Sequence, residues 1–155
     1  MARCFAAALI RRIDPKTGAR QLLIIHYQPV VTVAGERVKK GGFQIKFPGG
    51  KQEWHESPRQ TVRRECIAET GLIIRGQKQF CTIEITDGPQ HYFLTDFDRC
   101  KGKLRTGRDY HDQNADLGPP TWVDEDKLER LLHPNHRVAF RVYIKLESRP
   151  AQIHI

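Results

Sequence analysis

The segment Gly50–Leu72 constrains the fold of this chain more than any other, because it carries a helix start, a helix stop and several carboxylates. Ser57 is a favoured N-cap residue, and Pro58 suits the first helical turn, where a missing N–H costs nothing. Gly71 is typical of the position just beyond a helix C-terminus. We therefore expect a helix from Pro58 to Thr70.

Two glutamates of the expected helix, Glu65 and Glu69, are four residues apart and therefore lie on one face. Val62 and Cys66 have the same spacing and form the stripe that should face the core. Neighbouring carboxylates repel each other unless a cation lies between them, which Arg64 or a metal ion would provide. A solvated helix face would also tolerate such a pair, so the pair alone leaves both interpretations open.

The four residues that lead into this segment, and share Gly50 with it, favour a ligand site. They read Phe-Pro-Gly-Gly and end at Gly50. Paired glycines allow a tight turn whose backbone carbonyls can approach a ligand closely. Mg²⁺ and similar hard cations prefer carboxylate and carbonyl oxygens, and they are often shared with substrate phosphates. A glycine turn beside two acids is thus a candidate site for a metal and a phosphate.

The complete spacing of the segment resembles the signature of the Nudix hydrolases. Seven positions are in register with that signature: Gly50, Glu56, Arg64, Glu65, Glu69, Gly71 and Leu72. Two positions depart from it. Cys66 fills a slot that is usually a branched aliphatic residue, and Ala68 replaces the first of two paired glutamates.

The resemblance implies an enzyme that cleaves the pyrophosphate linkage of a nucleoside diphosphate joined to another moiety, with Mg²⁺ or Mn²⁺ as cofactor. It assigns the Gly49 carbonyl, Glu65 and Glu69 to the metal, with one glutamate as a possible base. It also implies that Arg64 orients the neighbouring glutamate and that Glu56 supports the site. Metal ions polarise phosphoryl oxygens and lower the pKa of bound water, and a nearby carboxylate can accept the water's proton.

Ala68 leaves a second interpretation open. The substitution removes a negative charge and a probable ligand from the signature. A catalytically impaired Nudix-fold module that binds nucleotide or RNA is therefore the alternative function.

The resemblance also predicts an acid in a distant loop, ahead of a Trp-Val strand. Trp122 and Val123 fit that strand, and Asp116 stands six residues before Trp122. Asp109 and Asp112 are alternatives in the same loop. Any of the three would otherwise be an ordinary solvated turn residue, because aspartate favours turns.

Positive charge gives a clue to the partner. The formal net charge is +8, and five Lys and Arg residues gather between residues 99 and 108. Lys101, Lys103 and Arg105 of this cluster are candidate substrate-binding residues. A basic loop folded over the cleft would attract a polyphosphate or an RNA end, whereas a basic loop without a partner would simply be solvated.

Length and composition limit the remaining possibilities. A chain of 155 residues predicts one domain, residues 1–155, with a sizeable core. No apolar run approaches the ~20 residues needed to span a bilayer, so we expect no membrane partner. The four cysteines show no metal-type spacing, which favours free thiols and a cytoplasmic location.

The order of the expected elements alternates between strands and helices. The strands are expected at residues 4–12, 22–27, 44–47, 73–85, 91–97 and 121–123. Residues 14–18 should form a hairpin turn, residues 34–42 a polar loop, and Asp124 should cap a short helix. Strict apolar alternation over residues 138–146 favours a strand, whereas the resemblance favours a helix. The implied fold class is α/β, a Nudix-type α/β/α sandwich with a mixed sheet.

Overall fold

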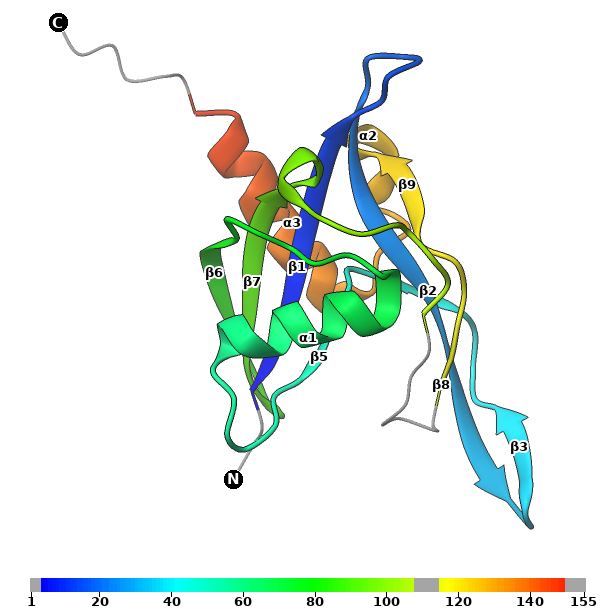
Figure 1. Ribbon diagram of the computed structural model, residues 1–155. Coiled ribbons are helices and arrows are strands. Elements are labelled where there is room, and N and C mark those ends of the chain that lie inside the picture. The colour runs from blue at the N-terminus through cyan, green and yellow to red at the C-terminus, as the bar shows by residue number, and fades with distance from the viewer. Residues whose placement is uncertain (1–3, 108–114, 150–155) are drawn as a thin grey trace, which may run out of the picture.

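A computed structural model of the protein describes residues 4–107 and 115–149, which form one mixed sheet with helices on both faces (Figure 1). The strands are β1 (Phe5–Ile13), β2 (Arg20–Val33), β3 (Glu36–Lys39), β4 (Gln44–Lys46), β5 (Gly49–Lys51), β6 (Lys78–Ile85), β7 (Gly88–Asp96), β8 (Ala115–Leu117) and β9 (Thr121–Asp124). The helices are α1 (Pro58–Thr70), α2 (Glu125–Leu128) and α3 (Pro134–Glu147), and the 3₁₀ turn η1 spans Phe97–Arg99.

The sheet is built around the central strands β1 and β2. Its main path runs β3-β2-β1-β7-β6, while β4, β8 and β9 pair with β2, and β5 pairs with β1. Strands β1 and β7 run parallel, and the other described pairs are antiparallel. The pairing with β1 holds β5 beside the second half of α1, where it meets Arg64, Glu65 and Glu69.

Two apolar layers lie on opposite faces of the sheet, because successive strand residues point to opposite sides. Along β1, Ala6, Ala8 and Ile10 pack toward α1, whereas Ala7 and Leu9 pack toward α2 and α3. Figure 1 shows α1 in front of the sheet and the C-terminal helices behind it. The expected α/β/α sandwich is confirmed.

Helix α1 has the expected bounds and caps. The Ser57 hydroxyl accepts the Gln60 backbone N–H at 3.2 Å, and the Gln60 side chain accepts the Ser57 N–H at 2.8 Å. Together these bonds form a capping box. Gly71 ends the helix in the left-handed region at φ 81°, and Val62 and Cys66 are fully buried as expected.

The tail of the chain forms helix α3 and not a strand. Its buried residues follow helical spacing: His136, Ala139, Phe140 and Tyr143. The alternating apolar residues that favoured a strand are therefore distributed around the helix, and Val138 is exposed. Packing of Ala139, Phe140 and Tyr143 against the rear face of the sheet holds this segment as a helix.

Three local expectations were wrong. Residues 34–42 were expected to be a loop, but the chain turns at Ala34 and Gly35 and returns as β3, paired with the far half of β2. The strand expected from residue 73 begins only at Lys78. Ile73 makes an isolated bridge to Lys101 instead of joining that strand. Asp124 precedes α2 without capping it, since its carboxylate accepts a hydrogen bond from Gln21 instead.

Two further observations concern the whole chain. In the parts of the chain that the structure describes, no helix is both long enough and apolar enough to cross a membrane. All four cysteines are unpaired thiols, and burial raises the pKa of Cys66 well above its ordinary value.

Candidate active site

The two glutamates of α1 lie against Gly49 and Gly50, which do not form the expected turn but are the first two residues of β5, paired with β1. Glu69 is buried, and its Oε1 accepts the Gly49 backbone N–H at 2.7 Å. A β-carbon placed on Gly50 would lie 2.5 Å from the Glu65 Oε1. Any larger residue at position 50 would therefore displace the Glu65 carboxylate. The helix face that the sequence predicted is thus directed at the paired glycines, which lie in a strand and not in the predicted turn.

Arg64 joins the helix to the preceding loop. Its guanidinium holds both oxygens of Glu56 at 2.8 and 2.9 Å, and a third nitrogen donates to Glu65 at 2.8 Å. It also donates to the Lys51 carbonyl at 3.1 Å. Because bidentate arginine–carboxylate contacts are strong and directional, Arg64 fixes the orientation of the Glu65 side chain.

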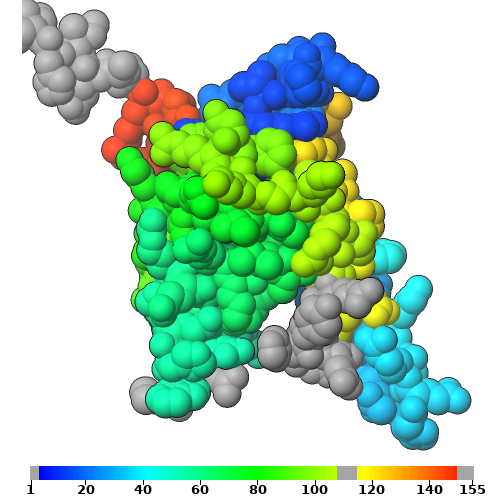
Figure 2. Space-filling view, in the orientation of Figure 1, coloured from blue at the N-terminus to red at the C-terminus, as the bar shows by residue number. Residues whose placement is uncertain are grey.

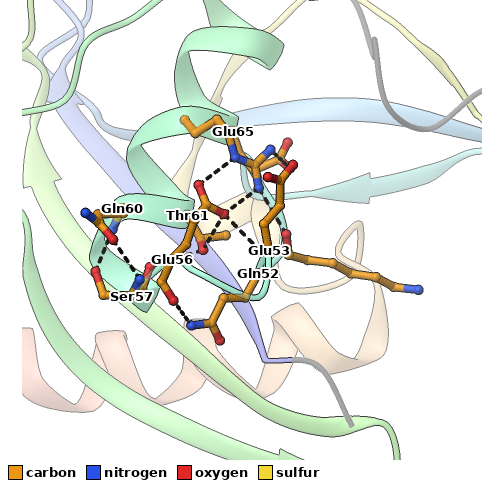
Figure 3. A network of polar contacts seen from close by, with 9 residues as sticks. Gln52, Glu53, Glu56, Ser57, Gln60, Thr61 and Glu65 are labelled. Atoms are coloured by element: carbon orange, nitrogen blue, oxygen red, sulfur yellow. Dashed lines mark hydrogen bonds and ion pairs between the residues drawn. The ribbon is translucent and has the colours of Figure 1, made fainter. Parts of the chain in front are cut away.

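Glu56 is the centre of a polar network around the first turn of α1 (Figure 3). Its carboxylate accepts the Glu53 backbone N–H at 3.0 Å and the Thr61 hydroxyl at 3.1 Å, in addition to Arg64. Hydrogen bonding from Arg64 is the largest cause that lowers the pKa of Glu56, to about 2. Glu56 therefore remains ionised at neutral pH and accepts hydrogen bonds, so it is unsuited to proton transfer there.

Comparison with protein-family models agrees with this geometry. The model described as the NUDIX domain matches residues 5–144, which is most of the chain. The chain belongs to the Nudix family. The comparison with curated proteins found no match.

Solved structures share the Nudix fold at low sequence identity. The solution structure of the E. coli ORF135 protein is 19% identical with a TM-score of 0.65, covering 97% of this chain and 94% of that one. The MutT NUDIX hydrolase from Burkholderia pseudomallei is 19% identical with a TM-score of 0.61, covering 90% and 95%. MutT protein from Methanosarcina mazei Go1 is 19% identical with a TM-score of 0.60, covering 95% and 96%. At this identity the similarity establishes the fold.

The donor set of the Nudix segment suits a hard divalent cation. Glu65 and Glu69 supply two carboxylates on consecutive helical turns, beside a glycine backbone that a side chain would obstruct. Within residues 4–107 and 115–149, no three His, Cys, Asp or Glu side chains converge into a metal cluster. Mg²⁺ is commonly bound through one or two carboxylates with waters and substrate phosphates, so two carboxylates are sufficient.

The distal acids predicted from the sequence have different positions. Asp116 lies on β8 opposite Gln28 of β2, and its carboxylate forms an ion pair with Arg37 of β3 at 3.1 Å. The Asp116 side chain is 55% exposed. Asp109 and Asp112 lie outside the described residues. A third carboxylate ligand therefore stays a prediction.

The three candidate substrate-binding cations lie beside the C-terminal end of α1 and the residues that follow it. The Arg105 guanidinium donates to the Ile67 carbonyl at 3.1 Å, and Lys101 pairs through its backbone with Ile73. Lys103 and Lys101 are exposed. All three cations are therefore exposed, and the Arg105 guanidinium is also hydrogen-bonded near the end of the helix.

A cavity next to β5 contains residues that the sequence analysis did not select. It has a volume of about 470 Å³ and is lined by Phe5, Lys51, Ile85, Asp87, Gly88, Gln90 and Asn135. These residues come from β1, β5, the β6–β7 hairpin and α3. No local pattern links them, so sequence spacing could not have identified them. Lys51 lines this cavity and also contacts Arg64 through its carbonyl, which connects the cavity to the acids.

Proposed function

We propose that this Nudix protein is a Mg²⁺- or Mn²⁺-dependent hydrolase of a nucleoside diphosphate linked to another moiety. One observation carries the proposal. Glu65 and Glu69 are held against Gly49 and Gly50 of β5, and Arg64 fixes the Glu65 carboxylate from the side. Acids at this spacing would be repulsive on a helix without a cation.

Each residue of the site has a proposed role. Glu65, Glu69 and the Gly49 carbonyl would hold the metal ion, which when bound polarises phosphoryl oxygens and activates water. Arg64 and Glu56 are positioning residues, because Arg64 binds Glu65 on one side and Glu56 on the other. A carboxylate of the pair would accept the proton of the attacking water.

The cavity beside β5 supports a nucleotide-type substrate. It offers an aromatic ring from Phe5, the amides of Gln90 and Asn135, and the positive charge of Lys51. Asp87 adds a carboxylate, so the lining combines the apolar Phe5 and Ile85 with several polar groups that would fix the orientation of a ligand. A base or sugar would bind in this cavity while its phosphates reach the acids beyond Lys51.

The unpaired thiols agree with the proposed cytoplasmic location.

The proposal is tested by hydrolysis assays on a panel of nucleoside diphosphate derivatives with Mg²⁺ or Mn²⁺. Glu69→Gln should lower kcat by about 100-fold or more, because it removes a ligand or base charge. Glu84→Gln is the matched control, since Glu84 is an exposed glutamate on β6. Turnover that Glu69→Gln leaves intact would refute the site.

The second candidate function is nucleotide or RNA binding without turnover, and Ala68 is the observation that favours it. The two functions predict different results from the same panel. Tight ligand binding with no turnover of any substrate, at saturating Mg²⁺ and Mn²⁺, would favour the binding module. Asp116→Asn in the same assays tests whether β8 supplies a third ligand, which would appear as a higher metal requirement.

A further inference from the structure

The outer side of α1 carries a concentration of positive charge. Apart from Arg64, which binds Glu56 and Glu65, seven basic residues lie on α1 and on the two segments beside it, and we call this set the basic face: Arg59, Arg63, Arg75, Arg99, Lys101, Lys103 and Arg105. Each of the seven is exposed. Within segments 71–77 and 97–107 the only acidic residue is Asp98.

Hydrogen bonds hold the segments of the basic face together. Backbone bonds of 2.9 and 3.0 Å join Ile73 and Lys101 in both directions, and the Arg105 N–H donates to the Thr70 carbonyl at 3.0 Å. The Arg59 guanidinium donates to the Gln77 carbonyl at 2.6 Å. Figure 2 shows α1 and these two segments as one continuous surface. The backbone segments that carry these charges are thus fixed relative to one another by the fold.

The basic face points away from the acids of the active site. Arg63 and Glu65 are two residues apart, which places them about 200° apart around the helix axis. None of the ion pairs among the described residues includes a member of the basic face. The carboxylates of α1 therefore do not neutralise this surface.

The basic face also leads toward the active site at one end. The segment that carries Lys101 and Lys103 continues to Gly107, where a β-carbon would lie 2.4 Å from the Glu69 Cα. The same β-carbon would lie 2.7 Å from the Ala68 carbonyl oxygen. A chain-like anion bound along this surface would therefore extend to the edge of the acid pair.

We infer that the basic face binds the phosphodiester backbone of a single-stranded nucleic acid. A row of cations with one acid matches a polyanion, and binding by phosphate contacts requires no base recognition. The one large apolar side chain exposed on the outer side of α1 is Ile67, at 38%. A membrane surface or a protein partner would need more apolar or aromatic area than this. The inference concerns binding and does not depend on turnover.

Fluorescence anisotropy with labelled 20-nucleotide RNA and DNA strands tests the inference, in EDTA so that no hydrolysis occurs. The wild-type protein should bind both strands without sequence preference, with affinity falling steeply as salt rises. The triple variant Arg63→Gln, Lys101→Gln, Lys103→Gln should weaken binding by on the order of tenfold or more. Its slope of log affinity against log salt should become shallower by about 2, since each lost phosphate contact removes about 0.7.

A control triple removes the same net charge elsewhere: Lys39→Gln, Arg130→Gln, Lys145→Gln. These residues are exposed on β3, after α2 and on α3, and the control should bind within about twofold of wild type. Equal weakening by both triples would overturn the inference, because net charge alone would then explain binding. A protein that binds neither the RNA nor the DNA strand at low salt would also overturn the inference. So would a protein that binds phosphatidylserine vesicles, measured in parallel, but neither strand. RNA and DNA arms distinguish which nucleic acid is preferred.

Discussion

Ala68 is the residue at which this chain departs most from the Nudix signature. It lies one helical turn beyond Glu65 and directly before the buried Glu69. Its carbonyl contacts the Gly107 region, while the short methyl side chain adds no charge to the acid pair. The described residues around it supply no third carboxylate for a metal cluster. In the proposed metal site, affinity for the cation is therefore the property that we expect this residue to limit most directly.

Introducing a carboxylate at this position should strengthen metal binding. Ala68→Glu is expected to lower the Mg²⁺ or Mn²⁺ concentration for half-maximal activity by on the order of tenfold, because cation affinity rises with ligand charge. Ala68→Gln has nearly the same size without the charge and should leave that concentration near the wild-type value. Metal titrations of hydrolysis, or of intrinsic tryptophan fluorescence, measure the effect. An equal shift in both variants would show that side-chain size, and not charge, is responsible.

At the scale of elements, α1 was predictable because its signals are local. Ser57, Pro58 and Gly71 mark its ends, and the spacing of Val62 and Cys66 marks its buried side. Strand β3 was not predictable in this way. All four of its residues are exposed, so it has no buried stripe, and its pairing with β2 uses backbone groups that any sequence provides.

The capping box of α1 should contribute measurably to the stability of the protein. Ser57→Ala removes the oxygen that accepts the Gln60 N–H and is expected to lower the free energy of unfolding by about 1 kcal/mol. Ser57→Asp keeps an acceptor at the same place and should retain most of that stability. Urea unfolding followed by circular dichroism makes the comparison. If alanine and aspartate destabilise the protein equally, the cap is not the source of the effect.

At the scale of the whole molecule, tertiary contacts decided what sequence spacing could not. Asp116 was selected for its distance from Trp122, yet its described ion pair is with Arg37 on the β3 arm, an element that was not expected. The cavity residues Phe5, Gln90 and Asn135 come together only when the sheet and α3 pack. By contrast, the apolar run over residues 6–10 of β1 is a local signal in the sequence, and it is buried in both layers of the core.

His136 joins the C-terminal helix α3 to the segment that precedes β5. Its Nδ1 accepts the Phe47 backbone N–H at 3.1 Å, so α3 is tied to the segment that leads into β5 and the site. The ring is buried among Phe5, Phe47 and Tyr92. Burial, with smaller contributions from the charges of Lys46 and His133, lowers the pKa of His136 well below its ordinary value. The imidazole is consequently neutral in the folded protein.

This buried histidine should make the fold sensitive to mild acid. The unfolded chain takes up a proton on His136 below about pH 6.5, whereas the folded chain resists it until a much lower pH. Because the unfolded state binds more protons, stability is full above about pH 6.5 and falls as pH decreases, by up to about 1.4 kcal/mol per pH unit. Urea unfolding between pH 7.5 and 5 measures this slope.

His136→Gln isolates the contribution of the buried ring, because the glutamine carbonyl can accept the Phe47 N–H but cannot titrate. The variant is expected to lose some packing stability at pH 7.5 and to show a smaller decline toward pH 5. His133→Gln is the companion control, since burial also lowers the pKa of His133, although less than that of His136. It should remove a smaller part of the pH dependence. A decline in His136→Gln as steep as in the wild type would assign the acid sensitivity to other groups, because only the proton uptake at His136 distinguishes the two proteins in this pH range.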